Sequence, residues 1–302
     1  MDDPKFSRRT AGLMALGAAG SGALALGAGA APALAARKSR DTLPTDPKEI
    51  LESVVRIYGT TGKGRVTWKT RITVYAVQAS GVVPLVGLRG SESGWWTRKD
   101  DSTWVRYSST LSFFEDLETG KFIDEFRNPL NGHVSKVGVS FIRHKEGEYR
   151  TTMGEYYGSM RKAFPQSYPE EPIAPNWSLD DGIVRYRGRS NFPPILKQPT
   201  LETATLTVRA DELFDPKVET PSATVSGFNI RPWEPWLGMG DAPGHVIWQY
   251  DGVKLTDVEK LDADYLARAR AHTPLFDESP QFDEGPSFFE RVIQNRGVKP
   301  AG

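Results

Sequence analysis

Hydrophobic and polar residues alternate along much of the chain, which is the pattern of β-strands with one buried face. The clearest case is residues 65–76, where Val66, Trp68, Ile72 and Val74 alternate with charged or hydroxyl-bearing residues. Successive side chains of a strand point to opposite faces, so the apolar set predicts a buried face. The same reasoning predicts strands at 82–89, 94–98, 103–114, 121–127, 134–143, 183–192 and 201–209, and weaker ones at 224–229 and 246–250.

Short segments rich in Gly, Asn and Pro separate these strands. Residues 118–120 and 128–132 have turn composition, and residues 90–94 (Gly-Ser-Glu-Ser-Gly) are predicted to form a mobile turn. Consecutive strands joined by short turns favour an antiparallel meander that curls on itself. We therefore expect a mostly β, antiparallel, barrel-like single domain with flanking helices at the N- and C-terminal ends.

Helix signals lie on both sides of the strands. Asp46 can cap a helix that begins at Pro47 and ends near Tyr58. Two more helices are predicted at 263–271 and 287–296. The Pro-rich segment 163–181 is predicted to be a long irregular crossing, which serves either as a lid or as a loop packed on the surface.

The N-terminal segment has the features of an export signal. Arg8 and Arg9 precede an apolar stretch at 10–31, and Ala33 and Ala35 are the small residues of a cleavage site. The paired arginines predict a twin-arginine-type signal at 1–35, cut after Ala35, and a periplasmic or secreted protein. An ordinary secretory signal and a retained membrane anchor are the alternatives. A linker at 36–45 and one β-rich domain at 46–302 follow, and no stable membrane insertion is expected after cleavage.

Composition excludes several kinds of function. The chain has 38 basic and 38 acidic residues, so no electrostatic attraction to nucleic acid is expected. It has no cysteine, which excludes thiol nucleophiles and thiolate-bound metals. Its four histidines lack metal-motif spacing, and no dinucleotide fingerprint, P-loop or G-x-S-x-G elbow occurs. We therefore expect neither a metal nor a cofactor.

Polar residues lie among the aromatic ones, which make up 11 % of the chain. Trp104 and Arg106 share one face of a predicted strand, where a buried arginine could hold a ligand carboxylate or phenolate. The alternative is a surface arginine stacked on tryptophan or paired with Glu115 or Asp116. His133 follows a turn and could act as a general base or be simply solvated.

The segment 231–244 combines three prolines with Trp233, Trp236 and Met239. Exposed aromatic residues in an irregular loop favour a binding wall. A loop that plugs one end of a barrel is the alternative, and the two interpretations are compatible.

The motifs of this chain resemble the DUF1838 family of bacterial proteins. The resemblance rests on the export signal, on Glu118-Thr119-Gly120-Lys121, on the 128–132 turn, and on the Trp/Pro/Gly pattern of 232–244. It spans most of 48–295. It implies a mostly β fold and transfers no catalytic residues.

Two functions are open for this chain, and both involve an apolar or aromatic small molecule. The first is a cofactor-independent lyase, isomerase or hydrolase using acid–base side chains. The second is a non-catalytic binding or carrier protein of the cell envelope, and a structural or partner-binding role is a further alternative. The candidate catalytic residues are Tyr107, His133, Asp241, Glu92 and Arg106. The candidate ligand-binding residues are Trp95, Trp96, Trp104, Trp233, Trp236, Met239 and Tyr250. The oligomeric state stays open.

Overall fold

A computed structural model of the 302-residue chain describes residues 42–152, 172–191 and 201–279. The predicted signal at 1–35, most of the predicted linker and the predicted helix at 287–296 lie outside these ranges. So does the first half of the predicted crossing at 163–181.

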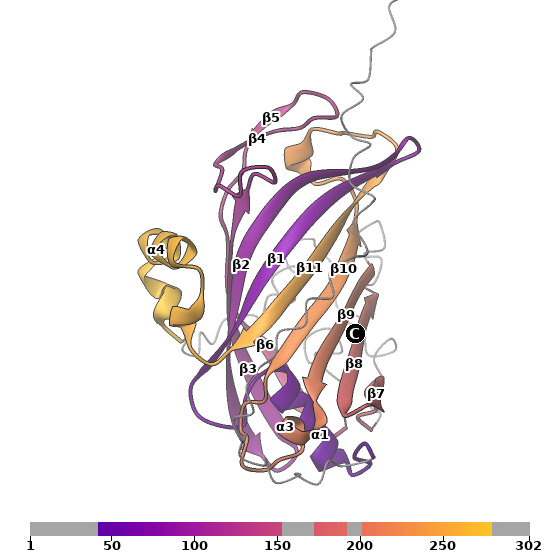
Figure 1. The fold of residues 1–302 in the computed structure, drawn as a ribbon, viewed down its shortest axis with the longest axis vertical. Helices are drawn as coiled ribbons and strands as arrows, with labels where there is room; N and C mark the ends of the chain where they lie inside the picture. Colours follow the sequence, from indigo (N-terminus) through magenta and orange to yellow (C-terminus); the bar gives the residue numbers. More distant parts are fainter. Residues whose placement is uncertain (1–41, 153–171, 192–200, 280–302) are drawn as a thin grey trace, which may run out of the picture. The chain divides into compact units, whose positions relative to one another are not determined.

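Nine strands form one antiparallel sheet in the order β6-β3-β2-β1-β11-β10-β9-β8-β7 (Figure 1). In chain order these strands are β1 (Arg65–Gln78), β2 (Gly81–Asp100), β3 (Thr103–Glu115), β6 (Ser140–Arg150), β7 (Trp177–Asp180), β8 (Ile183–Asn191), β9 (Leu201–Arg209), β10 (Ala223–Arg231) and β11 (His245–Leu255). A second, two-stranded sheet consists of β4 (Glu125–Arg127) and β5 (Val134–Lys136). The expectation of a mostly β, antiparallel fold is confirmed.

The nine-stranded sheet is strongly curled. In Figure 1, β2, β1, β11 and β10 lie in front, while β3 and β6 lie behind them. The order of strands leaves β6 and β7 as the two edges, and the described residues contain no pairing between them. A closed barrel is therefore not found in the described part of the chain.

Helix α1 (Pro47–Tyr58) packs against the inner face of the sheet at one end. It starts as expected, because the Asp46 side chain accepts hydrogen bonds from the backbone N–H groups of Lys48 and Glu49 at 2.9 and 3.1 Å. Its apolar side joins a buried cluster that includes Leu51, Val54, Trp68, Trp96, Trp104, Tyr149, Tyr186 and Leu206. Each aliphatic side chain buried here contributes about 1.5–3 kcal/mol of transfer free energy.

A second buried cluster occupies the opposite end of the inner face. It contains Val74, Val86, Leu88, Phe114, Phe126 and Leu237. Leu237 ends the short 3-10 helix η2 (Pro235–Leu237), and its carbonyl accepts a hydrogen bond from Asn128 Nδ2 at 2.8 Å. The predicted turn at 128–132 therefore fastens the Trp/Pro/Gly segment to this end of the sheet.

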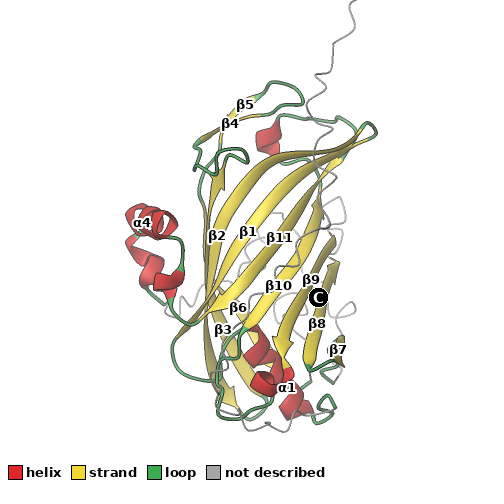
Figure 2. Ribbon diagram, in the orientation of Figure 1, coloured by secondary structure: helices red, strands yellow, loops and turns green. Residues whose placement is uncertain are grey.

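Helix α4 (Ala263–His272) covers part of the outer face of β1, β2 and β3 (Figure 2). The short 3-10 helices η3 (Val258–Lys260) and η4 (Pro274–Asp277) precede and follow it in the chain. A short helix α3 (Ala210–Leu213) follows β9. Tyr265 of α4 is buried, and its hydroxyl lies 2.8 Å from both Ser91 Oγ and the Leu111 carbonyl. Among the described helices, none is long and apolar enough to cross a membrane.

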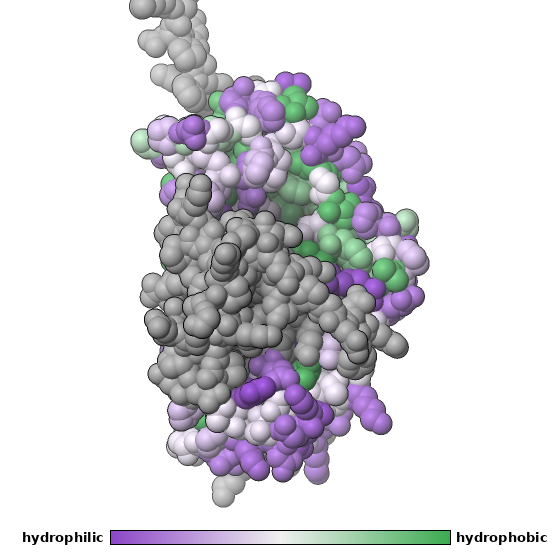
Figure 3. Space-filling view, turned by 180° about the vertical axis from the view of Figure 1, so that it is seen from behind, coloured by the Kyte–Doolittle hydropathy of each residue, from purple (hydrophilic) through white to green (hydrophobic). Residues whose placement is uncertain are grey.

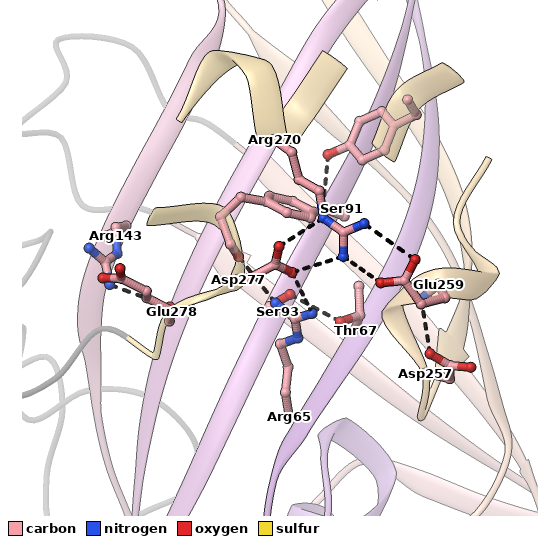
Figure 4. Close-up of polar contacts among 12 residues, drawn as sticks. Arg65, Thr67, Ser91, Ser93, Arg143, Asp257, Glu259, Arg270, Asp277 and Glu278 are labelled. Carbon is pink, nitrogen blue, oxygen red and sulfur yellow. Dashed lines mark hydrogen bonds and ion pairs between the residues drawn. The ribbon is translucent and has the colours of Figure 1, made fainter. Parts of the chain in front are cut away.

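Ion pairs hold this outer layer together. Figure 4 shows Arg270 between Glu259 and Asp277, and Arg65 of β1 also pairs with Asp277 at 3.2 Å. Hydroxyl groups of Thr67 and Ser93 bond to each other at 3.0 Å beneath this layer. The outer polar network thus ties α4 and η4 to the sheet and lies on the face opposite α1.

The described surface is mostly hydrophilic. Seen from behind, hydrophobic residues gather in the upper half on the side of α4 (Figure 3). The exposed large hydrophobic side chains belong to separate elements: Val82, Leu117, Val134, Phe228, Val253 and Leu275.

The predicted turn at 90–94 is wrong. These residues lie in the middle of β2, which is one strand of 20 residues. A Cβ at Gly90 would lie 2.5 Å from Ser112 Oγ and 2.9 Å from Thr70 Oγ1, so the glycine permits close packing of neighbouring side chains within the sheet. Gly90 therefore lets the side chains of neighbouring strands approach each other, and it does not reverse the chain.

Other strand boundaries also differ from the prediction. The predicted strand at 121–127 contributes only β4, and the one at 134–143 is divided between β5 and β6. In contrast, β10 and β11 are longer than expected, and β11 continues through Asp251 and Gly252 because both pair with β1. Strand β7 lies in the segment predicted to be irregular.

Candidate functional site

A cavity of about 360 Å³ lies on the inner face of the sheet. Residues of eight strands and of α1 line it, and its lining includes members of both core clusters or their neighbours, such as Trp68 and Ile72. Its polar lining residues are Thr70, Glu92, Arg106, Thr110, Ser112, Glu202, Asn229 and Arg231. Its aromatic lining residues are Tyr58, Trp68, Tyr149 and Tyr250. The cavity is therefore amphipathic.

The alternation of strand residues places these polar groups on the inner face. In β1, Thr70 occupies the same face as Trp68 and Ile72, so it is a polar position within an otherwise apolar series. In β3, Thr110 and Ser112 share the face of Arg106. One polar band thus crosses the inner face.

An ion pair between Arg106 and Glu92 lies in the wall formed by β2 and β3. The Arg106 side chain is only 6 % exposed, whereas that of Glu92 is 34 % exposed. Gly94 lies between Glu92 and Trp96 on the same face of β2, and its lack of a side chain leaves space beside the guanidinium. The guanidinium carbon also lies 5.6 Å from the Trp96 ring centroid. Its partner is thus Glu92 rather than Glu115, which pairs with Arg89 on the outer face.

Tyr250 of β11 lies in a second wall of the cavity, which is formed by β9, β10 and β11. Its hydroxyl donates a hydrogen bond to the Thr203 carbonyl at 3.1 Å and lies 3.4 Å from Glu202 Oε1. The ring occupies the space over Gly227, where a Cβ would come within 2.7 Å of the Tyr250 hydroxyl. Burial, followed by the charge of Glu202, raises the pKa of Tyr250, so its hydroxyl stays protonated near neutral pH.

Asn229 and Arg231 extend this wall along β10. Asn229 is 8 % exposed and faces Trp248 directly across the β10–β11 pairing. The Arg231 guanidinium lies 4.9 Å from the Trp248 ring centroid and 3.7 Å from a Glu234 carboxylate oxygen. Burial raises the pKa of Glu234, and the charge of Arg231 opposes that shift.

Three of the predicted site residues line the cavity: Glu92, Arg106 and Tyr250. Trp96 and Trp104 lie on the same inner face but belong to the core cluster around α1. Trp95 and Tyr107 face each other on the outer face, where Arg65 lies 5.9 Å from the Trp95 ring. Burial raises the pKa of Tyr107.

The remaining predicted residues lie at the η2 end. Trp233, Trp236 and Met239 pack against the second core cluster, and the Trp236 ring meets Phe114 and Phe126 edge-on at 5.3 and 5.4 Å. These three side chains therefore help to fill the η2 end of the inner face. His133 is exposed and lies against Gly238, and Asp241 is exposed in a turn, so neither reaches the cavity lining.

Sequence reasoning missed Glu202, Asn229 and Arg231, and also Tyr58 and Thr70. The signal is weak where it exists: Thr70 is a polar residue between Trp68 and Ile72 on one face of β1. Glu202, for example, precedes Ala204 and Leu206 on the inner face of β9. Only knowledge of strand order places these residues opposite Arg106.

The lining carries balanced charge. Glu92 and Glu202 offset Arg106 and Arg231, so the cavity has no strong preference for a charged molecule. It can supply hydrogen bonds from arginine, tyrosine and hydroxyl groups beside apolar surface. Within the described residues, no group of three or more His, Cys, Asp or Glu side chains could hold a metal ion.

Comparisons with known proteins give one informative match. No curated protein matches the sequence. A solved structure of a DUF1329 family protein from Desulfovibrio piger is similar to 73 % of this chain and 97 % of its own, at 12 % identity and a TM-score of 0.20. The model of a family described as protein of unknown function, DUF1838, matches residues 65–287, which include every strand of the curled sheet. The chain belongs to the DUF1838 family.

Proposed function

We propose that this protein binds an apolar or aromatic small molecule in the cavity on the inner face of its sheet. The observation that carries the proposal is the amphipathic cavity of about 360 Å³ between the α1 and η2 ends. Small-molecule sites occupy about 300–1,000 Å³ and combine apolar walls with a few placed polar groups.

The packing of the interior supports a ligand rather than a packing defect. Protein interiors are close-packed, and voids larger than a water molecule are few. Among the described residues, both ends of the inner face are filled by large apolar side chains, whereas the middle is left open between paired charges. Burying charged pairs is costly and adds little to stability, which favours a role in recognition.

The ligand's apolar part would lie against aromatic and aliphatic surface. Tyr58 and Tyr149 lie toward the α1 end, and Ile72 lies toward the η2 end. Burial of an aromatic ring against such surface is a major source of binding free energy. The size of the cavity suits a molecule of about one or two rings.

Acid–base catalysis is a second candidate function, and the Glu92–Arg106 pair favours it. Glu92 is the more exposed partner and could accept a proton from a substrate, while Arg106 could stabilise the anion that forms. This describes a cofactor-independent lyase, isomerase or hydrolase. Tyr107, His133 and Asp241 have no part in this form of the hypothesis because they do not line the cavity.

The proposed site of action is the periplasm or the medium. Support comes from the paired Arg8 and Arg9, the apolar stretch at 10–31 and the small residues before position 36. A neutral, cysteine-free chain is compatible with this environment.

Native mass spectrometry of the mature protein tests the binding proposal. We expect a co-purifying small molecule that is released on denaturation. The variant Thr70→Trp fills the cavity and should lose that molecule, whereas Thr73→Trp, on the opposite face of β1, should retain it. Both variants are compared by thermal unfolding. Equal retention by two folded variants would contradict the proposed site.

The two candidate functions differ in the fate of that molecule. Incubation with fresh protein should leave it unchanged if the protein is a carrier and should convert it if the protein is an enzyme. Glu92→Gln keeps a hydrogen-bonding group next to Arg106 but removes the base. Loss of conversion with retained binding would favour catalysis.

A further inference from the structure

Three buried polar atoms without hydrogen-bond partners among the described residues belong to neighbouring residues of the paired strands β10 and β11. They are Asn229 Oδ1, Arg231 Nε and Trp248 Nε1. Asn229 and Trp248 are directly opposite in the antiparallel register, and Arg231 stacks on the Trp248 ring. Leaving a buried polar group unpaired is destabilising, so three such groups on neighbouring residues call for a partner.

The cavity lies beside this group of atoms. Asn229 and Arg231 both line it, and Asn229 is 8 % exposed. The terminal torsion of an asparagine side chain is broad and roughly two-fold, so a small rotation turns its amide toward the cavity. A bound molecule can therefore reach Asn229 and Arg231. Trp248 does not line the cavity itself, but it pairs with Asn229 across the two strands and its ring stacks against Arg231.

The three atoms define the hydrogen bonds that a ligand must supply. Asn229 Oδ1 accepts a hydrogen bond, whereas Arg231 Nε and Trp248 Nε1 each donate one. A ligand group must therefore combine an N–H or O–H with an acceptor oxygen. A carboxylate has no donor for Asn229 Oδ1, and it would compete with Glu234, which already pairs with Arg231 at 3.7 Å.

We propose that Asn229, Arg231 and Trp248 bind a neutral carboxamide or lactam group of the ligand. The ligand N–H donates to Asn229 Oδ1, and the ligand carbonyl accepts from Trp248 Nε1 and Arg231 Nε. The apolar part then lies in the cavity toward Ile72 and Tyr250. This inference rests on the proposed binding function and adds the chemical class of the ligand.

Three probes of similar size test the proposal with the mature protein: benzamide, benzoate and toluene. NMR titration of each gives its affinity. Two or three hydrogen bonds of ordinary strength predict that benzamide binds at least about ten-fold more tightly than toluene or benzoate. Thr70→Trp should abolish the binding of all three.

Two variants separate the polar group from the rest of the cavity. Asn229→Leu removes the amide at similar volume, and Trp248→Phe removes the indole N–H but keeps an aromatic ring. Each should lower the benzamide affinity about five- to ten-fold and leave toluene unchanged. Thermal unfolding shows which variants remain folded, and either one suffices for the test.

The outcomes also distinguish this inference from the proposed function. Equal affinities for benzamide and toluene, both lost in Thr70→Trp, would overturn the carboxamide assignment and leave the cavity as a binding site. Unchanged benzamide affinity in both variants would do the same and would indicate that water satisfies the three atoms. No binding of any probe, together with no co-purifying molecule, would overturn both.

Discussion

The Lys254 side chain ends at the C-terminus of α1, where its Nζ lies 2.6 Å from the Arg56 carbonyl oxygen. It donates further hydrogen bonds to the carbonyls of Ile57 and Gly59, each at 3.2 Å. A helix leaves its last carbonyls unpaired and carries partial negative charge there. Lys254 of β11 therefore fixes the helix that closes one end of the inner face.

Replacing Lys254 should destabilise the protein. Lys254→Met keeps much of the apolar stem but leaves three buried carbonyls without this donor, so the free energy of unfolding should fall by about 2–4 kcal/mol. Urea unfolding measures the change. Lys63→Met, at an exposed position, is the control and should change stability by less than about 0.5 kcal/mol. Similar losses in both variants would contradict the role of Lys254.

Lys254 should also make stability depend on pH. Burial lowers the pKa of Lys254 to about 7 in the folded protein, from an ordinary value of 10.5. Between these values the unfolded chain binds the additional proton, so this lysine makes folding more favourable as the pH rises. The difference in unfolding free energy between the natural protein and Lys254→Met should grow from pH 7 to pH 9. A constant difference would show that the three carbonyls keep Lys254 protonated.

Gly227 should be intolerant of a side chain. A Cβ there would meet the Thr203 carbonyl and come within 2.7 Å of the Tyr250 ring and hydroxyl. Gly227→Ala should therefore displace Tyr250 and cost about 1–3 kcal/mol of unfolding free energy. Gly138→Ala is the matched control because no atom lies within 4 Å of a Cβ at that position. Thermal unfolding of the two variants compares them directly.

The Trp/Pro/Gly segment should serve stability rather than ligand contact. Trp236 packs edge-on against Phe114 and Phe126 and does not line the cavity. Trp236→Ala should lower the unfolding free energy by about 2–4 kcal/mol while benzamide and toluene keep their relative affinities. A selective loss of one probe would instead place Trp236 in the binding site.

The N-terminal arginine pair should direct export. Replacing Arg8 and Arg9 by lysine keeps the charge but removes the twin-arginine address, so the precursor should stay in the cytoplasm. Cell fractionation followed by N-terminal sequencing measures this, with Ala36 expected as the first residue of the exported protein. Export of the double variant at the normal rate would favour an ordinary secretory signal.

Local patterns predicted most of the elements. The capping signals at Asp46 and Pro47 locate α1, and the alternation around Trp68 identifies β1 and its inner face. The clearest error, at residues 90–94, comes from interpreting a run of small residues as a turn. In this sheet small residues let neighbouring strands carry larger side chains, as Gly90 does beside Ser112.

The candidate site was only partly predictable for a topological reason. Arg106 and Glu92 are near in sequence and lie on paired strands, but the prediction of a turn at 90–94 hides their pairing and leaves Glu115 and Asp116 as the expected partners of Arg106. Glu202 and Asn229 reach the same cavity because β9 and β10 pair beyond β11, a long-range order that no local signal contains. Trp233 and Trp236 drew attention through composition, although their place at the end of the sheet depends on contacts with residues about 100 positions earlier in the chain, such as Asn128 and Phe126.

A crystal structure of the mature protein, purified without exposure to denaturant, shows whether the cavity holds a ligand. We expect electron density for one small organic molecule in the cavity, in contact with Thr70, Arg106 and Tyr250, with a polar group toward Asn229. A cavity that holds only ordered water, or an organic molecule bound solely on the outer face, would contradict the proposed binding site.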